Sequence, residues 1–248
     1  MTTTLITCAT SGMGSAIAQS LDDELILTGR NVDKLSQLCQ SLPNKANAIE
    51  LDFFSEHSVG KAAKQISQLN QIDRVVFIIP RIPPSSSLFP DNQTWQELYN
   101  HYFIRPLGLL KYLVEQERLN RGAKLVFLSG LSSKSALENY STNNCLRSAW
   151  LGQAKTLALG LGELGISVNT LSLGGVMTES YTDKLRAKAL ANHVDFDQQM
   201  SREVSNVPLK KYASVQDVVD AVHGLLGPLT NHMTGQNILL DGGFFRGY

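Results

Sequence analysis

The sequence predicts a single α/β domain with a parallel, doubly wound (Rossmann-type) sheet and helices on both faces. Short apolar runs alternate with stretches of helical periodicity along the chain, which is the pattern of repeated strand–helix units. A glycine-containing turn joins the first apolar run to the first helical stretch. The 248 residues are enough to bury one full core, and no linker-like segment divides them. We therefore expect one domain over residues 1–248.

The predicted strands are short apolar runs bounded by turn residues. They cover residues 5–8, 25–28, 48–51, 74–79, 124–129, 167–173 and 237–240. The fourth run stops at Pro80, because proline cannot donate to a strand ladder. Four prolines and three serines between Pro80 and Pro90 predict a loop at the carboxyl end of that strand. Ligands of open α/β sheets bind at this edge, so the loop is a candidate part of a site.

The predicted helices carry apolar residues at helical spacing. One begins near Ala16, and the others cover residues 33–42, 94–117, 143–164 and 215–226. Residues 174–207 contain no clean strand and carry Met177, Tyr181, Phe196 and Met200. We expect this segment to form a mobile substrate lid, and an ordinary amphipathic helix pair fits it equally well.

The amino-acid composition limits the classes of binding partner. Lys and Arg total 22 against 22 for Asp and Glu, so no net field favours nucleic acid or an anionic membrane, and a small molecule or another subunit is expected. The three cysteines form no Cys-x-x-Cys pair, which predicts neither a disulfide framework nor a metal site. The N-terminus lacks the features of a signal peptide, and no apolar run is long enough to span a bilayer. A cytoplasmic protein is expected.

The turn from Thr7 to Gly14 resembles that of the short-chain dehydrogenase/reductase family, which reads T-G-x-x-x-G-x-G. Gly12 and Gly14 keep two of its glycines, which let the backbone approach a pyrophosphate held by N–H groups at a helix N-terminus. Cys8 replaces the first glycine and adds a side chain where the cofactor would pass.

The resemblance extends over nearly the whole chain. Its other motifs are Leu27–Asn31, Leu51–Phe53, Gly165–Asn169, Met233–Gln236 and Asp241–Phe244. It implies a sheet of about seven strands and an oxidoreductase that acts on a small carbonyl or alcohol. It also implies a homodimer or homotetramer, packed through the C-terminal strand and the helices that begin near Thr94 and Asn143.

The end of the second strand predicts the cofactor. An NAD-preferring site places an acid there, whereas Thr28 is neutral and Arg30 can pair with a 2′-phosphate. If a dinucleotide binds, NADP(H) is therefore favoured. The residue matching Asp52 contacts the adenine amino group in the family. The cofactor-binding residues that the resemblance implies are Thr7, Gly12, Met13, Gly14, Arg30, Asp52, Phe53 and Thr178.

The catalytic positions depart from the family. Its oxidoreductases use a serine, a tyrosine 13 residues later as general acid or base, and a lysine four residues beyond. Counting back without gaps from Gly165–Asn169 places these at Gly130, Asn143 and Arg147, at the same spacing. None retains the chemistry, since glycine has no hydroxyl, an amide does not exchange a proton near neutral pH, and arginine keeps its charge. The family's relay asparagine falls on Tyr102, and its N-N-A-G segment is Phe77–Pro80 here.

Two function classes stay open. In the first, a rebuilt NADP(H)-linked oxidoreductase uses Tyr140 or Tyr102 as the proton donor and Arg147 to support cofactor or substrate charge. Each tyrosine is equally explained as a partly buried aromatic with a satisfied hydroxyl. Ser129, Ser132 and Ser133 lie close to Gly130 in the sequence.

In the second class, the chain is redox-inactive and serves as a ligand-binding or partner subunit, or as a non-redox lyase or isomerase. Halohydrin dehalogenases share this fold and replace the lysine by arginine, as Arg147 does here. They keep their serine and tyrosine, however, so this chemistry is a minor alternative.

Overall fold

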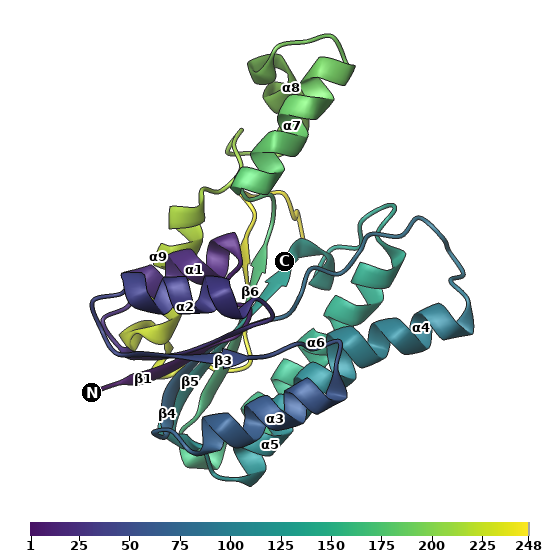
Figure 1. Cartoon of the computed structure of the whole chain (residues 1–248). Coiled ribbons are helices and arrows are strands. Elements are labelled where there is room, and N and C mark those ends of the chain that lie inside the picture. Colours follow the sequence, from purple (N-terminus) through teal and green to yellow (C-terminus); the bar gives the residue numbers. More distant parts are fainter. Residues whose placement is uncertain (248) are drawn as a thin grey trace.

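The computed structural model describes residues 1–247 and contains one parallel sheet of seven strands in the order β3-β2-β1-β4-β5-β6-β7 (Figure 1). The strands are β1 (Thr3–Ile6), β2 (Glu24–Gly29), β3 (Ala46–Glu50), β4 (Ile72–Ile78), β5 (Leu119–Gly130), β6 (Ser167–Leu173) and β7 (Asn237–Leu240). Strand order reverses between β1 and β4, so the carboxyl ends of these two strands border the crevice where such sheets bind ligands. The predicted fold class and the parallel sheet are confirmed.

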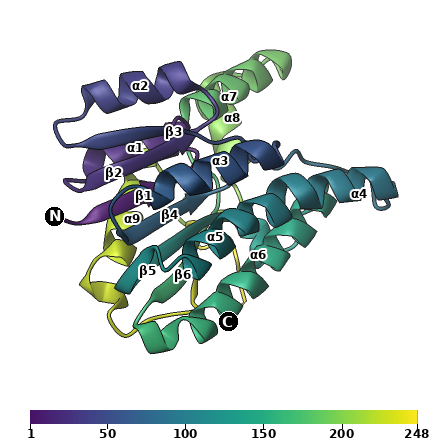
Figure 2. The same ribbon diagram turned by 60° about the horizontal axis from the view of Figure 1, so that its bottom comes forward.

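Helices cover both faces of the sheet (Figures 1 and 2). One face carries α1 (Gly12–Ser20), α2 (Val32–Ser41) and α9 (Val215–Leu226). The other carries α3 (Glu56–Ser67), α5 (Arg105–Glu115) and α6 (Ser141–Gly160), with α4 (Asn92–Tyr99) leading into α5. Each layer closes its own apolar core, one against α3, α5 and α6, the other against α1, α2 and α9.

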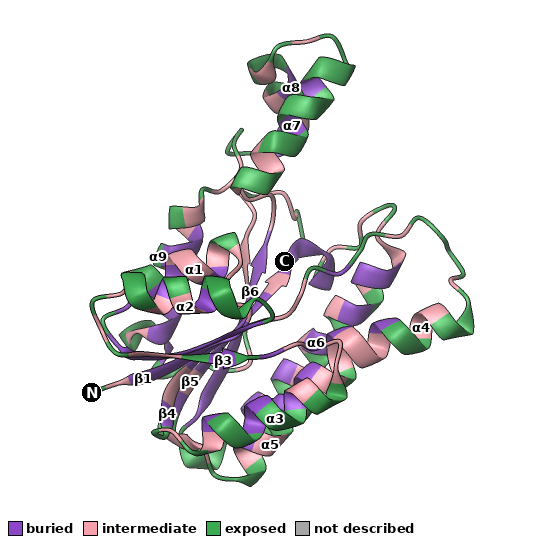
Figure 3. Cartoon of the chain, viewed as in Figure 1, coloured by how far each residue is buried: buried purple, intermediate pink, exposed green. Residues whose placement is uncertain are grey.

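Burial follows this layering (Figure 3). Every residue of β1, β2 and β6 is buried, as expected for central strands covered on both faces. Trp150 on α6 packs against Phe77, Phe103 and Phe127 with ring centroids 5.1–5.6 Å apart. Its indole N–H donates to the carbonyl of Tyr102 at 2.6 Å, so α6 is held to the turn between α4 and α5.

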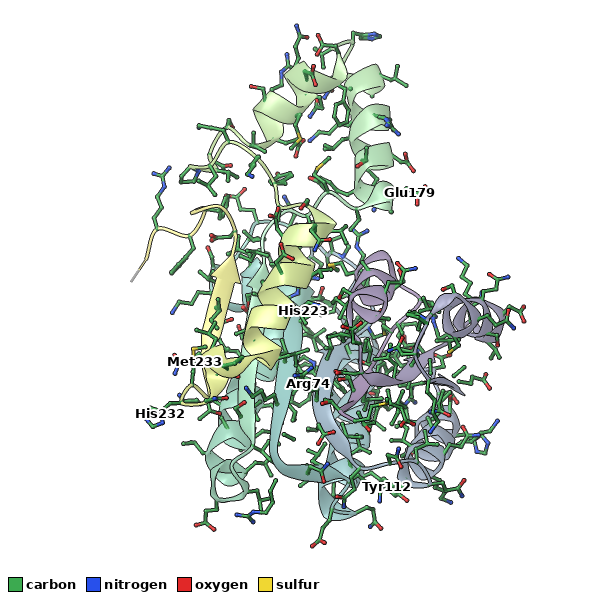
Figure 4. All side chains as sticks on the ribbon, turned by 90° about the vertical axis from the view of Figure 1, so that its left-hand side faces the viewer. Arg74, Tyr112, Glu179, His223, His232 and Met233 are labelled. Atoms are coloured by element: carbon green, nitrogen blue, oxygen red, sulfur yellow. The ribbon has the colours of Figure 1, made fainter. Side chains whose placement is uncertain are left out.

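Polar contacts join elements that are distant in the sequence. Arg74 on β4, labelled in Figure 4, forms an ion pair of 3.0 Å with Asp23, and the Thr4 hydroxyl donates to the same carboxylate at 2.5 Å. His223 on α9, also labelled, lies 2.9 Å from the Ser20 hydroxyl at the end of α1. These pairs fix the amino end of β1 and the α1–α9 contact. Among residues 1–247, no helix is both long and apolar enough to cross a membrane.

Several elements differ from the sequence prediction. Strand β1 lies at Thr3–Ile6 and not at 5–8, so Cys8 belongs to the following turn. Helix α3 was not predicted; its core face includes Ala62 and Ala63, whose small side chains give a weak apolar signal. The single helix expected over 94–117 is instead α4, a π-helical turn at Asn100–Ile104, and α5. Strand β5 begins at Leu119, five residues before the predicted start, and pairs there with Ile72.

The segment 174–207 contains two helices, α7 (Glu179–Ala191) and α8 (Phe196–Glu203), which extend from the body of the domain beyond the carboxyl edge of the sheet (Figure 1). Glu179, labelled in Figure 4, marks the start of α7. Most of this pair is exposed (Figure 3), and Leu185, Ala189 and Gln199 are buried between the helices. The pair therefore has little core of its own.

Thr7 provides a test of how β1 is joined to β4. Its fully buried hydroxyl donates to the carbonyl of Ile78 and accepts from the N–H of Ile78, both at 2.7 Å. Thr7→Val keeps the shape but leaves that buried N–H unpaired, so the free energy of unfolding should fall by about 1–3 kcal/mol in urea titrations. The control Thr156→Val, on exposed α6 surface, should change it by less than about 0.5 kcal/mol. Equal losses in both variants would contradict this assignment.

Candidate active site

A cavity of about 540 Å³ opens at the carboxyl edge of the sheet. The turn after β1 and the ends of β4, β5 and β6 form its floor, and its walls come from the loop after β4, the start of α6 and the start of α7. Most lining residues are apolar. The polar and charged side chains that line it are Ser11, Arg81, Ser129, Tyr140, Asn143, Arg147, Thr178, Ser180, Tyr181, Tyr212 and Asp241, together with the Cys8 thiol and Thr170.

The turn after β1 is tightly folded. Cys8 adopts φ +50°, a left-handed conformation that costs a side-chain-bearing residue about 1–3 kcal/mol. A Cβ at Gly14 would lie 2.6 Å from the Cys8 carbonyl oxygen, so this glycine is required by the turn itself. Burial raises the pKa of the Cys8 thiol to about 12, with Arg30 opposing and Asp52 adding to the shift. The thiol therefore stays protonated and neutral near pH 7.

The start of α1 fits a phosphate group. The Ser11 hydroxyl accepts from the N–H of Gly14 at 3.0 Å, and within residues 1–247 no acceptor pairs with the N–H of Gly12 or Met13. A Cβ at Gly12 would meet no atom within 4 Å, so packing does not explain this glycine. Open space above free N–H groups at a helix N-terminus is what a pyrophosphate needs.

The end of β2 offers a cation and no acid. Arg30 is exposed, with its guanidinium carbon 5.0 Å from the centre of the Phe54 ring. Thr28 is buried, and its hydroxyl donates to the Ile6 carbonyl at 3.4 Å. Asp52 accepts the N–H of Phe54 through one carboxylate oxygen at 3.0 Å. Arg30 thus presents a positive charge at the end of β2, and Asp52 presents a carboxylate just after β3.

Several residues expected to bind the cofactor also make contacts within the protein. The Thr7 hydroxyl is used by β4, as described above. Phe53 is buried in the core with its ring 6.0 Å from that of Phe77, outside the cavity lining. Thr178 caps α7 by accepting the N–H of Tyr181 at 3.3 Å, and it also lines the cavity. Met13 lines the cavity as predicted from the turn.

Arg147 lies directly over Gly130. A Cβ at Gly130 would be 1.9 Å from Nη1 and 2.4 Å from Cζ of Arg147, so the guanidinium occupies the space of the missing side chain. Nη1 donates to the Ser132 hydroxyl at 3.2 Å. Burial lowers the pKa of Arg147; a phenolate at Tyr140 would raise it, and the positive charge of Arg81 lowers it further. The charges of Arg81 and of an ionised Tyr140 therefore both act on Arg147, and all three residues line the same cavity.

Asn143 anchors the proline-rich loop. Its Nδ2 donates to the carbonyl of Ile82 at 3.1 Å, and it is 1% exposed, with Oδ1 buried and unpaired within the described residues. Thr142 and Ser141 donate to further carbonyls of the same loop, at Pro83, Ser85 and Ser87. The first turn of α6 thus fixes the cavity wall that residues 80–87 provide.

The two candidate tyrosines are placed differently. Tyr140 precedes α6, follows Asn139 at φ +59°, and lines the cavity. Tyr102 is buried in an aromatic cluster with its ring 5.5 Å from that of Phe54, and it is not among the described residues that line the cavity. Burial raises the pKa of Tyr102, and Arg30 opposes this shift. The geometry brings Tyr140, and not Tyr102, together with Arg147.

The three serines near Gly130 have different surroundings. Ser129 lines the cavity, Ser132 accepts from Arg147, and Ser133 lies 2.7 Å from the Ser172 hydroxyl. Ser129 is therefore the hydroxyl of this group that faces the cavity.

Sequence reasoning did not single out Arg81 or Tyr212, and it noted Tyr181 only as part of the lid. Tyr181 and Tyr212 face each other with ring centroids 5.7 Å apart, and the Tyr212 hydroxyl donates to the Glu203 carbonyl at 3.1 Å. Burial is the main cause of the raised pKa of both phenols. Tyr181 and Tyr212 lie far from residues 130–147 in the sequence, so their place in the same cavity could not be predicted. Arg81 directly follows the end of a predicted strand, and this position could have indicated it.

Comparisons with known proteins agree on the fold. The family model described as enoyl-(acyl carrier protein) reductase matches residues 8–245. The NADPH-dependent reductase BacG of Bacillus subtilis is 23% identical over 253 residues, covering 98% of each chain. L-sorbose reductase of Gluconobacter frateurii, solved with NADPH and L-sorbose, has a TM-score of 0.90 at 19% identity, covering 100% of this chain and 97% of that chain.

A third relative is a short chain oxidoreductase of Pseudomonas aeruginosa, solved with NADPH and described as containing an atypical catalytic center. Its TM-score is 0.86 at 19% identity, covering 100% of this chain and 98% of that chain.

The contact between Gly130 and Arg147 predicts a change of sign in a double-mutant cycle. In the wild type, Gly130→Ala must displace the guanidinium from Ser132, which should lower the free energy of unfolding by about 1 kcal/mol. In Arg147→Ala protein that obstacle is absent and the backbone at Gly130 is extended (φ −131°, ψ 164°), so alanine should stabilise by about 0.5 kcal/mol. Urea unfolding of the four proteins gives both values. The same effect of Gly130→Ala in both backgrounds would contradict the contact.

Proposed function

Because the chain belongs to the short-chain dehydrogenase/reductase family, we propose that it is an NADP(H)-dependent oxidoreductase of a small carbonyl or alcohol with a rebuilt set of proton-transfer residues. The observation that carries the proposal is that the turn bearing the free N–H groups of Gly12 and Met13 borders, through Ser11 and Met13, the same cavity as Tyr140 and Arg147. The turn before α1 fits a pyrophosphate, and on the other side of the cavity Tyr140 is a possible proton donor beside the positive charge of Arg147.

NADP(H) is favoured over NAD(H) by the end of β2. Arg30 supplies a positive charge for a 2′-phosphate. Residue 28, where an NAD-preferring site would have an acid, is the neutral Thr28. BacG is an NADPH-dependent reductase, and the sorbose and Pseudomonas enzymes were solved with NADPH, which supports the same choice. The Cys8 side chain takes up space in the turn, but its thiol is neutral and does not repel a phosphate.

The proposed chemistry uses groups that face the cavity. When bound, NADPH supplies the hydride. Tyr140 donates a proton to the substrate oxygen, and the guanidinium of Arg147 stabilises the negative charge that develops on the phenol oxygen. Ser129 holds the substrate oxygen through its hydroxyl. Gly130 and Asn143 take no part in the proton transfer, since one has no side chain and the other is bonded to the loop.

We also propose that α7 and α8 act as a substrate lid. Ser180 and Tyr181 at the start of α7 line the cavity, while the remainder of the pair extends away from the body of the domain. A movement of α7 would therefore change the size of the opening directly.

The second candidate is a redox-inactive ligand-binding protein. Asn143 favours it, because a residue without acid–base chemistry occupies the position that the family alignment gives to the general acid. The two candidate functions differ in cofactor binding and in turnover, and both properties can be measured.

Titration with NADPH and NADH tests the cofactor. NADPH should bind at least about tenfold more tightly than NADH, since a charge-assisted contact to the 2′-phosphate contributes about 1.5–3 kcal/mol. Arg30→Ala should remove this preference, whereas Lys64→Ala, an exposed cation near the end of α3, should leave it intact. Fluorescence titration or thermal stabilisation measures both constants. Absence of binding at millimolar cofactor would reject the oxidoreductase.

Tyr140→Phe tests the proton donor. NADPH oxidation is followed with a panel of aldehydes, ketones and oxo acids; loss of the general acid should reduce kcat by about 100-fold or more and leave the dissociation constant of NADPH unchanged. Tyr102→Phe is the matched control, and its turnover should stay near the wild-type value because its ring lies outside the cavity lining. Full activity in Tyr140→Phe would remove Tyr140 from the mechanism.

A further inference from the structure

Two arginines line the cavity without a carboxylate partner. Arg81 reaches it from the loop after β4, and Arg147 from α6. Of the ion pairs formed within residues 1–247, none includes either arginine. Their charges act on each other, since Arg81 contributes to lowering the pKa of Arg147. Two like charges at one cavity create a field that attracts an anion.

The one carboxylate among the described lining residues does not balance them. Asp241 lines the same cavity, but its Oδ1 accepts the N–H of Gly243 at 2.8 Å and its Oδ2 accepts the N–H of Phe245 at 2.9 Å. The carboxylate is therefore bound within the segment after β7. The cavity keeps an excess of positive charge.

Arg147 also has unused hydrogen-bonding capacity. A guanidinium carries five N–H donors, and the Ser132 hydroxyl is the one side-chain or backbone acceptor paired with it in the part of the chain that the structure describes. A largely buried cation with so few partners is costly unless an anion joins it. The planar donor fork matches a carboxylate, which accepts two parallel hydrogen bonds.

We propose that the substrate is an oxo acid, whose carboxylate binds Arg147 and Arg81 while Tyr140 reaches its ketone oxygen. This inference rests on the proposed oxidoreductase function and names its substrate class. Tyr140 and Arg147 line one cavity, so a substrate that carries its carboxylate close to its ketone, as 2-oxo and 3-oxo acids do, can reach both residues. The apolar walls, among them Ile79, Ile82 and Leu137, accommodate an apolar remainder.

The reaction balances without a further reagent. The ketone carbon gains a hydride from NADPH, its oxygen gains the Tyr140 proton, and the products are a hydroxy acid and NADP⁺, after which solvent restores the proton to Tyr140. The carboxylate itself is unchanged and serves only to hold and orient the substrate.

Charge-matched pairs of probes test the substrate class. The probes are pyruvate, 4-methyl-2-oxopentanoate and phenylpyruvate, each compared with its neutral methyl ester. Calorimetry measures binding to the full-length protein, with and without saturating NADP⁺, which fills the cofactor site but cannot reduce the acid. We expect at least one acid to bind about tenfold or more tightly than its ester, because the ester cannot form the charge-assisted pair. No acid binding, or equal binding of every acid and its ester, overturns the proposal.

Variants assign the preference to the two arginines. Arg81→Gln and Arg147→Gln should each remove most of the acid-to-ester ratio, while Arg81→Gln leaves NADPH binding unchanged. Lys134→Gln is the control, because it removes a nearby positive charge that lies beside Phe245 and outside the cavity lining. If Arg147→Gln weakens NADPH and leaves the ratio intact, the guanidinium serves the cofactor and the proposal fails. If the ratio holds but NADPH does not bind, the anion site stands and the oxidoreductase function fails.

Discussion

The packing of Arg147 over Gly130 is the constraint on which the rest of the site depends. The guanidinium fills the space that a side chain at 130 would enter, so any larger residue there must displace the arginine from Ser132. Ser132 then becomes the hydroxyl that orients the arginine. Asn143, one turn earlier on α6, is bonded to the loop carbonyl of Ile82 and leaves the cavity beside Arg147 to Tyr140. The contacts of Gly130, Asn143 and Arg147 thus depend on one another.

The turn between β1 and α1, at the other end of the cavity, does not depend on the contact between Arg147 and Gly130. Gly14 is fixed by the close approach of the Cys8 carbonyl, whereas Gly12 leaves space that no protein atom uses. Gly14 is a requirement of the turn, and the space at Gly12 is what a phosphate above the N-terminus of α1 would need. The turn before α1 therefore keeps the geometry that a phosphate needs, whatever side chains line the rest of the cavity. This is why we propose that the chain binds a dinucleotide and transfers the proton by another residue.

The fold and the positions of the strands could be predicted because buried parallel strands are short apolar runs, and β6 and β7 match the predicted ranges residue for residue. Helix α3 was missed because Ala62 and Ala63 contribute little to an apolar pattern. The site was harder. Spacing placed Gly130, Asn143 and Arg147 together, but only coordinates distinguish Tyr140 from Tyr102, since the π-helical turn sets the direction of Tyr102. Arg81 lies in an irregular loop, where no periodicity predicts which way a side chain points.

A crystal structure of the protein with NADPH tests the central claim most directly. The account predicts that the pyrophosphate lies on the N–H groups of Gly12 and Met13, and that the nicotinamide ring lies at the end of β5 with Arg147 still over Gly130 and the Tyr140 hydroxyl facing the ring. A nicotinamide that displaces Arg147 from Gly130, or a Tyr140 side chain directed away from the ring, would contradict it.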